Sequence, residues 1–219
     1  MIKGVIFDMD GLLINSEPLW YETKISVFGQ VGIHLTVDLC RQTSGLRLDD
    51  IVGYWYAKKP WQTPSKDEVG RQLIEKVIEL VATKGEKMPG VDYVLDFVKE
   101  KGVKIALASS SPMRLIEAAV KGLQLENCFD GVCSAEFEKH GKPHPAVYLK
   151  AAKTLKLPPS QCLAFEDSPN GLLSAKSAKM KCVCVPDKSH KDDPRLKIAD
   201  VILPSLSEFN EELWQRLNK

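Results

Sequence analysis

The sequence predicts an α/β fold, in which a parallel sheet is covered by helices and interrupted by one all-helical block. The first observation is that short apolar runs recur along the chain, each followed by polar residues and a helical stretch, which is typical of strand–loop–helix units. The second is that residues 16–84 show helical periodicity and no convincing strand. The expected strands lie at residues 5–7, 103–108, 132–134, 162–165, 182–185 and 201–203.

The expected helices begin at recognisable capping residues. In Ser16-Glu17-Pro18, Ser111-Pro112 and Ser168-Pro169, a hydroxyl precedes a proline suited to the first helical turn. Ser65 and Glu68 form a capping box within the helical block. We therefore expect these hydroxyls to bind the first free N–H groups of their helices.

The all-helical block is interpreted as a subdomain inserted after the first strand. Helical periodicity covers residues 20–28, 48–56 and 69–81. The alternative is that these helices simply cover the sheet, but a parallel crossover usually needs only about a dozen residues or more. We expect an α/β core of residues 1–15 and 85–219 and a helical cap of residues 16–84, with hinges at residues 13–15 and 88–90.

Composition and charge exclude several classes of protein. The 219 residues include 30 Lys and Arg against 29 Asp and Glu, so the balance predicts neither nucleic acid nor a membrane as a partner. No apolar run approaches the ~20 residues that span a bilayer, and the early acidic residues do not resemble a signal peptide. The six cysteines lack a CxxC pair and are expected to be buried free thiols. We expect a cytoplasmic protein that is a monomer or a weak dimer.

Pairs of acidic residues follow two of the expected strands. Asp8 and Asp10 come directly after the first strand, and Glu166 and Asp167 follow the fourth. In open α/β sheets, ligands bind at the carboxyl ends of the strands, where these pairs would meet. Adjacent carboxylates repel one another, so a cation such as Mg²⁺, which prefers oxygen ligands, would stabilise them. Taken singly, each pair would also fit an acidic turn or a helix start.

Hydroxyls and a lysine follow other strands of the same sheet. Ser109 and Ser110 end the strongest apolar run at an expected helix start, where hydroxyls and backbone N–H groups form a phosphate cradle. Lys142 lies between Gly141 and Pro143 on a stiff loop, and its ammonium group suits phosphate. A helix cap and a surface lysine are the simpler interpretations of each feature alone. Their convergence on one edge of the sheet favours a phosphate site.

These motifs resemble, in order and spacing, the four motifs of the haloacid dehalogenase superfamily. The motifs are Asp8-x-Asp10, Ser109, Lys142 and Glu166-Asp167. The resemblance is to the branch of phosphatases and phosphohexomutases with a helical cap, and it covers essentially the whole chain. Residues 7–13, 16–20 and 166–171 look most like bacterial hexitol and 2-deoxyglucose-6-phosphate phosphatases. The resemblance implies a Rossmann-like core and Mg²⁺-dependent hydrolysis of small sugar or sugar-alcohol phosphates.

The resemblance also implies a role for each motif residue. Asp8 would be the nucleophile that forms an aspartyl-phosphate, and Asp10 would protonate the leaving alcohol and later activate water. Mg²⁺ would be bound by Asp8, the backbone carbonyl of Asp10 and Asp167. Glu166 would lie in or near the same shell. The residues expected to hold the phosphoryl group are Ser109, Ser110 and Lys142.

Three features of the expected cap and hinge remain open. Many relatives have Asp where this chain has Asn15, which keeps the hydrogen-bonding shape but loses a charge. We expect activity to survive this change, and the lost charge to bear on cap closure or metal affinity. Arg47 lies where cap loops of relatives reach over the site and is a candidate to clamp substrate oxygens, although a surface arginine fits equally well. Trp20, Trp55 and Trp61 are expected to be packing residues rather than sugar platforms.

Two alternative functions accompany the leading one. A β-phosphoglucomutase-like isomerase would use the same core and return the phosphoryl group to another sugar hydroxyl. The cap around Trp20 lacks the histidine found in that mutase family, which favours hydrolysis. A pseudouridine-5'-phosphatase-like hydrolase is the other alternative. In each case the expected partner is a small phosphorylated metabolite.

Overall fold

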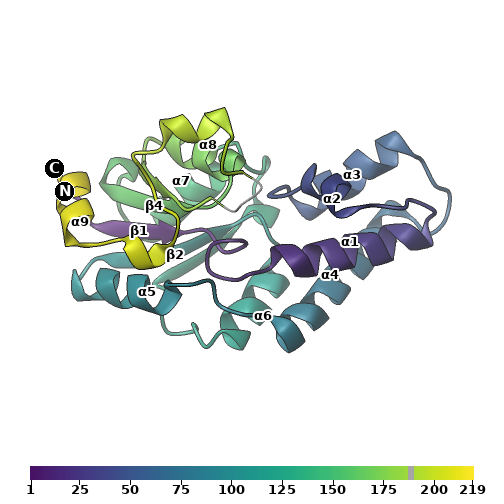
Figure 1. Ribbon diagram of the computed structural model, residues 1–219, viewed down its shortest axis with the longest axis horizontal. Coiled ribbons are helices and arrows are strands. Elements are labelled where there is room, and N and C mark those ends of the chain that lie inside the picture. The colour runs from purple at the N-terminus through teal and green to yellow at the C-terminus, as the bar shows by residue number, and fades with distance from the viewer. Residues whose placement is uncertain (187–189) are drawn as a thin grey trace.

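The computed structural model describes residues 1–186 and 190–219 and contains a parallel sheet covered on both faces by helices (Figure 1). Within these residues the sheet has six strands in the order β3-β2-β1-β4-β5-β6, and all neighbours pair in parallel. The strands are β1 (Gly4–Phe7), β2 (Lys104–Ser109), β3 (Gly131–Ser134), β4 (Cys162–Glu166), β5 (Lys181–Cys184) and β6 (Val201–Ile202). Each expected strand is present within one residue of its expected bounds, and the α/β class is confirmed.

Helices cover both faces of the sheet because strand side chains alternate between the faces. In β1, Val5 and Phe7 join the core under α5, α6 and α9, whereas Ile6 joins the core under α7 and α8. These helices are α5 (Val91–Glu100), α6 (Met113–Gly122), α7 (Ala146–Thr154), α8 (Pro169–Ser177) and α9 (Glu211–Asn218). Short 3₁₀ helices are η1 (Ala135–Phe137), η2 (Pro159–Gln161), η3 (Pro194–Ile198) and η4 (Leu206–Glu208). No helix in the described part of the chain is long and apolar enough to cross a membrane.

The helical block between β1 and α5 has a hydrophobic core of its own. Its helices are α1 (Glu17–Gln30), α2 (Val37–Arg41), α3 (Leu48–Lys58) and α4 (Lys66–Lys84), of which the short α2 was not expected from the sequence. Phe28, Trp55 and Leu73 are buried together inside it. Helices α2 and α3 lie away from the sheet, whereas α4 packs against α6 (Figure 1). This separate core supports the interpretation of the block as a cap.

The two connections between the helical block and the sheet domain run side by side. The amide of Asn15 donates to the carbonyl of Glu86 at 2.9 Å, and the amide of Met88 donates to the carbonyl of Leu13 at 3.1 Å. Asn15 contributes to this pairing through its backbone, and its side chain is exposed. Any motion of the block relative to the sheet must therefore bend both paired segments together.

The second expected hinge, residues 88–90, begins in the paired segment and ends at Gly90. Gly90 has a φ of 85°, and a Cβ added there would lie 2.3 Å from the backbone nitrogen of Ser207. This close packing fixes Gly90 against the sheet domain, where it precedes α5. The segment that pairs with residues 13–15 is residues 86–88, which overlaps the expected hinge of residues 88–90 at Met88.

Candidate active site

Three carboxylates lie at the carboxyl ends of two neighbouring strands. β1 and β4 pair in register, with Phe7 opposite Phe165, and the two rings stack with centroids 4.8 Å apart. Asp8 and Glu166 therefore occupy neighbouring positions at the end of the sheet. Asp8 and Asp167 are each 5% exposed, and Glu166 is fully buried. The sheet thus holds these acids on a rigid, largely dry platform.

The carboxylates of Asp8, Glu166 and Asp167 form a cluster that fits a divalent cation. One oxygen from each lies within 4.8 Å of the others. Burial, reinforced by the neighbouring acids, raises the pKa of Asp8 to about 7 and raises that of Asp167 well above its usual range. A bound cation would offset the free-energy cost of burying these carboxylates in their charged form. Carboxylate oxygens are ligands that Mg²⁺ prefers. The donor set therefore suits Mg²⁺.

Two glycines make room for this cluster. Gly11 has a φ of 78°, and a Cβ there would lie 2.3 Å from Oδ2 of Asp167. A Cβ on Gly171 would lie 1.9 Å from Oε1 of Glu166. Any side chain at either position would displace a carboxylate of the cluster, and at Gly11 the backbone would also be strained. Gly11 thus allows β1 to turn sharply while Asp167 approaches from β4.

Lys142 supplies the positive charge within the cluster. Its Nζ donates to Oδ1 of Asp8 at 2.7 Å and to Oε1 of Glu166 at 2.6 Å. Burial alone would lower the pKa of Lys142, but the two carboxylates outweigh it and raise the pKa. Tyr148, which the sequence analysis missed, donates from its hydroxyl to Oε1 of Glu166 at 2.7 Å. Its position on the apolar face of α7 made it indistinguishable from a core residue.

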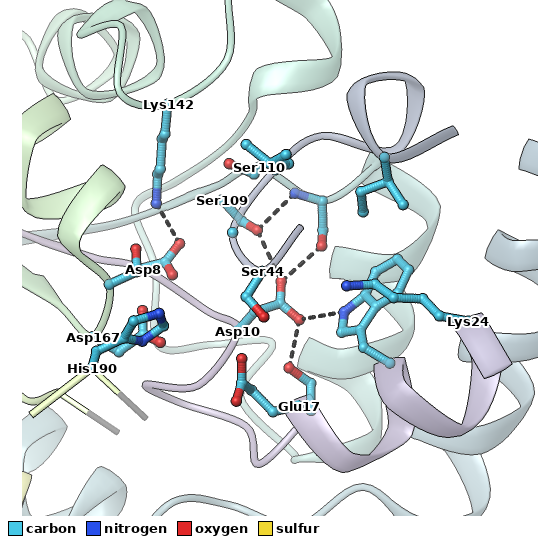
Figure 2. A pocket seen from close by; sticks show the side chains of 17 residues that line it. Asp8, Asp10, Glu17, Lys24, Ser44, Ser109, Ser110, Lys142, Asp167 and His190 are labelled. Carbon is cyan, nitrogen blue, oxygen red and sulfur yellow. Dashed lines mark hydrogen bonds and ion pairs between the residues drawn. The ribbon is translucent and has the colours of Figure 1, made fainter. Parts of the chain in front are cut away.

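Asp10 points away from this cluster, toward hydroxyls and an indole (Figure 2). Its Oδ1 accepts from Ser16 Oγ at 2.7 Å and from Trp20 Nε1 at 3.2 Å. Its Oδ2 accepts from Ser111 Oγ at 2.7 Å and from Ser109 Oγ at 3.3 Å. Two donors come from the helical block and two from the sheet domain. The Asp10 carboxylate therefore bridges the two parts of the molecule.

These bonds correct three expectations about individual side chains. Ser16 and Ser111 were expected to cap helices, but Ser16 makes no side-chain cap bond and both hydroxyls bind Asp10. Ser168 does cap α8, accepting from the amide of Gly171. Trp20 was expected only to pack, yet its indole N–H binds Asp10 and it lines the cavity.

The two candidate phosphate-binding serines differ in their hydrogen bonding. Ser109 is fully buried, and its hydroxyl both donates to Asp10 and accepts from the amide of Ser111 at 3.0 Å. The hydroxyl oxygen of Ser110 is buried without a hydrogen-bond partner among the described residues, and Ser110 lines the cavity. An unpaired buried hydroxyl is costly, and a phosphoryl oxygen would satisfy it. Ser110 is therefore the better placed of the two to contact substrate directly.

Arg47 does not line the cavity in this conformation. Its guanidinium donates to Oδ2 of Asp50 at 3.1 Å and to the carbonyl of Glu138 at 3.0 Å. It also lies over Gly141, where a Cβ would come within 2.8 Å of its side-chain carbons. The expected clamp on substrate oxygens is therefore replaced by a contact between the helical block and the loop that carries Lys142.

A cavity between the helical block and the sheet contains the catalytic candidates. Its volume is about 50 Å³. From the sheet domain, Asp8, Ser110 and Lys142 line it, and from the helical block Trp20 and Lys24 do so. Lys24 was not singled out from the sequence, because one lysine within a helical stretch carries no distinguishing pattern. The cavity thus joins the acids and lysine at the sheet to side chains that only the block supplies.

Comparison of the sequence with known proteins finds a matching family. The model of the haloacid dehalogenase-like hydrolases matches residues 5–185. The chain is 42% identical over 213 residues to hexitol phosphatase B of Escherichia coli strain K12, which covers 95% of this chain and 94% of that protein. It is 31% identical over 218 residues to a probable pseudouridine-5'-phosphatase of Drosophila melanogaster, covering 96% and 93%.

One solved structure with the same fold is that of a mutase. The crystal structure of β-phosphoglucomutase from Clostridium difficile superposes with a TM-score of 0.86 at 24% identity, covering 100% of this chain and 97% of that one. At this identity the match establishes the shared fold alone. The family match and the 42% identical relative confirm the resemblance inferred from the motifs. This chain belongs to the haloacid dehalogenase-like hydrolase family.

Proposed function

We propose that this enzyme hydrolyses the phosphate monoesters of small sugars or sugar alcohols, with Asp8 as the nucleophile. The observation that carries the proposal is the position of Asp8, buried at the end of β1 and bound by Lys142 at 2.7 Å, in the cavity that Asp10 also lines. Similarity to hexitol phosphatase B over nearly the whole of both chains supports this substrate class.

The proposed reaction has two steps that the side chains divide between them. A carboxylate oxygen of Asp8 attacks phosphorus while the bond to the sugar oxygen breaks, and protonated Asp10 gives its proton to that leaving oxygen. Water then attacks the phosphorus of the aspartyl-phosphate, Asp10 takes a proton from the water, and Asp8 is released. Lys142 and the unpaired hydroxyl of Ser110 are placed to hold phosphoryl oxygens, so their donors stabilise the charge that develops.

We propose that Asp8 and Asp167 hold Mg²⁺, together with the backbone carbonyl of Asp10. Glu166 is less available as a ligand, because its oxygens already accept from Lys142, Tyr148 and two backbone amides. Its role is then to fix Lys142 and the turn after β4. A bound Mg²⁺ supplies positive charge to the transferring phosphoryl group and to the acids around it.

The helical block is proposed to act as a lid that is hinged at residues 13–15 and 86–88. The cavity of about 50 Å³ is far smaller than the roughly 300 Å³ or more of ordinary ligand sites, so a sugar phosphate must enter an opened form. Closing returns Ser16 and Trp20 to Asp10 and so orients the acid only when the lid is shut.

Free cysteines, all six of which are described, suit a cytoplasmic location.

Hydrolysis is favoured over transfer to a second sugar hydroxyl by the chemistry of Trp20. Asp10 could take a proton from either attacking group, so a mutase needs, besides this base, a further group that accepts a hydrogen bond from the second sugar hydroxyl and holds it toward the aspartyl-phosphate. The Trp20 indole N–H already donates to Asp10 and has no acceptor to offer. Water, activated by Asp10, is therefore the expected acceptor of the phosphoryl group.

A substrate panel tests the proposed function. The purified enzyme with Mg²⁺ is expected to release inorganic phosphate from hexitol and hexose 6-phosphates, with kcat/KM well above that for pseudouridine 5'-phosphate or a phosphopeptide. A coupled assay for glucose 6-phosphate formed from β-glucose 1-phosphate should remain at background. Preferred turnover of pseudouridine 5'-phosphate, or isomerisation without phosphate release, would reassign the substrate or the reaction.

Removing divalent cations is expected to abolish phosphate release and to lower the melting temperature. The physical reason is that Asp8, Glu166 and Asp167 then face one another with Lys142 as the counter-charge within their cluster. The measurement is activity and thermal melting after treatment with a chelator, followed by addition of Mg²⁺ or, as a control, of K⁺ at equal ionic strength. Full activity in the chelated enzyme would exclude the proposed Mg²⁺ site.

A further inference from the structure

The cap places a buried lysine in the wall of the active-site cavity. Lys24 lies in the middle of α1 and is only 2% exposed. It lines the same cavity as Asp8 and Lys142, and its side chain extends from α1 toward the region of Asp10 (Figure 2). The mechanism proposed above gives this ammonium group no task.

The hydrogen bonds of Lys24 leave part of its donor capacity unused. Its Nζ donates to the carbonyl of Cys40 and to Oγ1 of Thr43, both at 3.2 Å. Among the residues that the structure describes, no carboxylate lies within ion-pair distance of Nζ. An ammonium group has three N–H donors, so one is left beyond these two bonds, on an Nζ that also lies 5.9 Å from the centroid of the Trp20 ring. Burial lowers the pKa of Lys24 to about 8.

The hydrogen-bond acceptors of Lys24 within the cap supply no counter-charge for its ammonium group. Both acceptors are neutral, and burying an ammonium group against neutral acceptors is costly, whereas an apolar side chain of similar length would fill the same volume. Surface lysines of the cap, such as Lys76 beside Glu79, remain in contact with water. A buried charge facing a substrate cavity is instead typical of a group that meets a ligand.

We propose that Lys24 is a specificity-determining residue whose free N–H donates to a hydroxyl of the substrate chain, at the end remote from the phosphate. The inference rests on the proposed function and names a side chain that would recognise the polyhydroxylated part of its substrates. A neutral hydroxyl is the fitting acceptor, because the cavity wall already contains the carboxylates of Asp8, Asp10 and Asp167. A second anion on the substrate would add to that negative charge.

The test compares two substrates in matched variants. For Lys24→Met, kcat/KM for a hexitol 6-phosphate is expected to fall about 10- to 100-fold, as for the loss of a hydrogen bond from a charged donor. For p-nitrophenyl phosphate, which has no remote hydroxyl, the change should stay within about 3-fold, since nothing there contacts Lys24. Lys24→Gln keeps an N–H donor and should recover part of the loss. Lys76→Met is the matched control for removing a cap lysine.

The outcomes separate this inference from the proposed function. An equal loss on both substrates, in a Lys24→Met or Lys24→Gln variant that melts like the wild type, would overturn the role of Lys24 alone. Wild-type enzyme that cleaves p-nitrophenyl phosphate but not hexitol phosphates would reject the substrate class and the Lys24 contact together. A Lys24-dependent preference for a hexonate 6-phosphate, whose remote end is a carboxylate, would replace the hydroxyl by an anion and overturn the neutral-acceptor proposal.

Discussion

Asp8→Asn is expected to reduce phosphate release by at least about 10³-fold while leaving the protein folded. An amide of nearly the same size cannot attack phosphorus or balance the charge of a cation as a carboxylate does. The side chain is 5% exposed and faces Lys142, so an amide oxygen can still accept from that lysine. Turnover with a hexitol phosphate and thermal melting, measured on the same preparation, check both halves of the expectation.

The stability of the wild type is expected to depend on pH through Asp8, and Asp8→Asn is expected to lack that contribution. Burial and neighbouring acids raise the pKa of Asp8 from 3.8 to about 7, so the folded state holds the proton more tightly than the unfolded chain does. In chelated buffer, wild-type stability that is present below pH ~4 is therefore lost as the pH rises toward 7. The amide that replaces this carboxyl group in Asp8→Asn does not titrate. The melting temperature of the variant should therefore equal or exceed that of the wild type at neutral pH.

A matched substitution and a clear contrary result complete this test. Asp96→Asn changes an exposed aspartate on α5 and should alter neither turnover nor melting. Near-normal turnover of a folded Asp8→Asn variant would remove Asp8 from the nucleophile role. A fall in melting temperature with rising pH that is equal in both proteins would place the titration on other groups.

Lys142→Ala is expected to lower kcat/KM by about 30- to 1,000-fold, the range found when one fixed donor to a developing negative charge is removed. The variant should also melt earlier in chelated buffer, because Asp8 and Glu166 lose their buried counter-charge. Added Mg²⁺ should raise the melting temperature of the variant more than that of the wild type, since the ion then supplies positive charge near the same acids. Steady-state kinetics on the folded fraction and melting with and without Mg²⁺ measure these effects.

Lys139 provides the control for Lys142. It lies three positions earlier on the same loop and is exposed, so Lys139→Ala should change kcat/KM by less than about 2-fold. Equal, small effects of the two substitutions would contradict the assignment of Lys142. A large effect of Lys142→Ala on melting alone, with normal turnover in Mg²⁺, would limit its role to stability.

The sequence alone determined the sheet and the order of the chemical groups along its edge. The apolar runs are short and separated by helical stretches, and this alternation leaves few arrangements other than a parallel sheet. Acids and serines directly after such runs must appear at one edge, because parallel strands end on the same side. Asp8, Ser109 and Glu166 follow this rule, since each is fixed by a position next to a strand rather than by a distant contact.

Only the tertiary structure decided which partner each of these groups meets. Ser16 and Ser111 look like helix caps in the sequence, but the start of the helical block and the turn after β2 both meet Asp10, and each hydroxyl donates to its carboxylate at 2.7 Å. Lys24 has no pattern that marks it, because its burial depends on α1 packing against α2 and the loop after it. The bond of Ser16 joins the helical block to the sheet domain, and the bonds of Lys24 join α1 to residues 40–43, so no local periodicity encodes them. Substrate choice is proposed to depend on the position that the second set gives to Lys24.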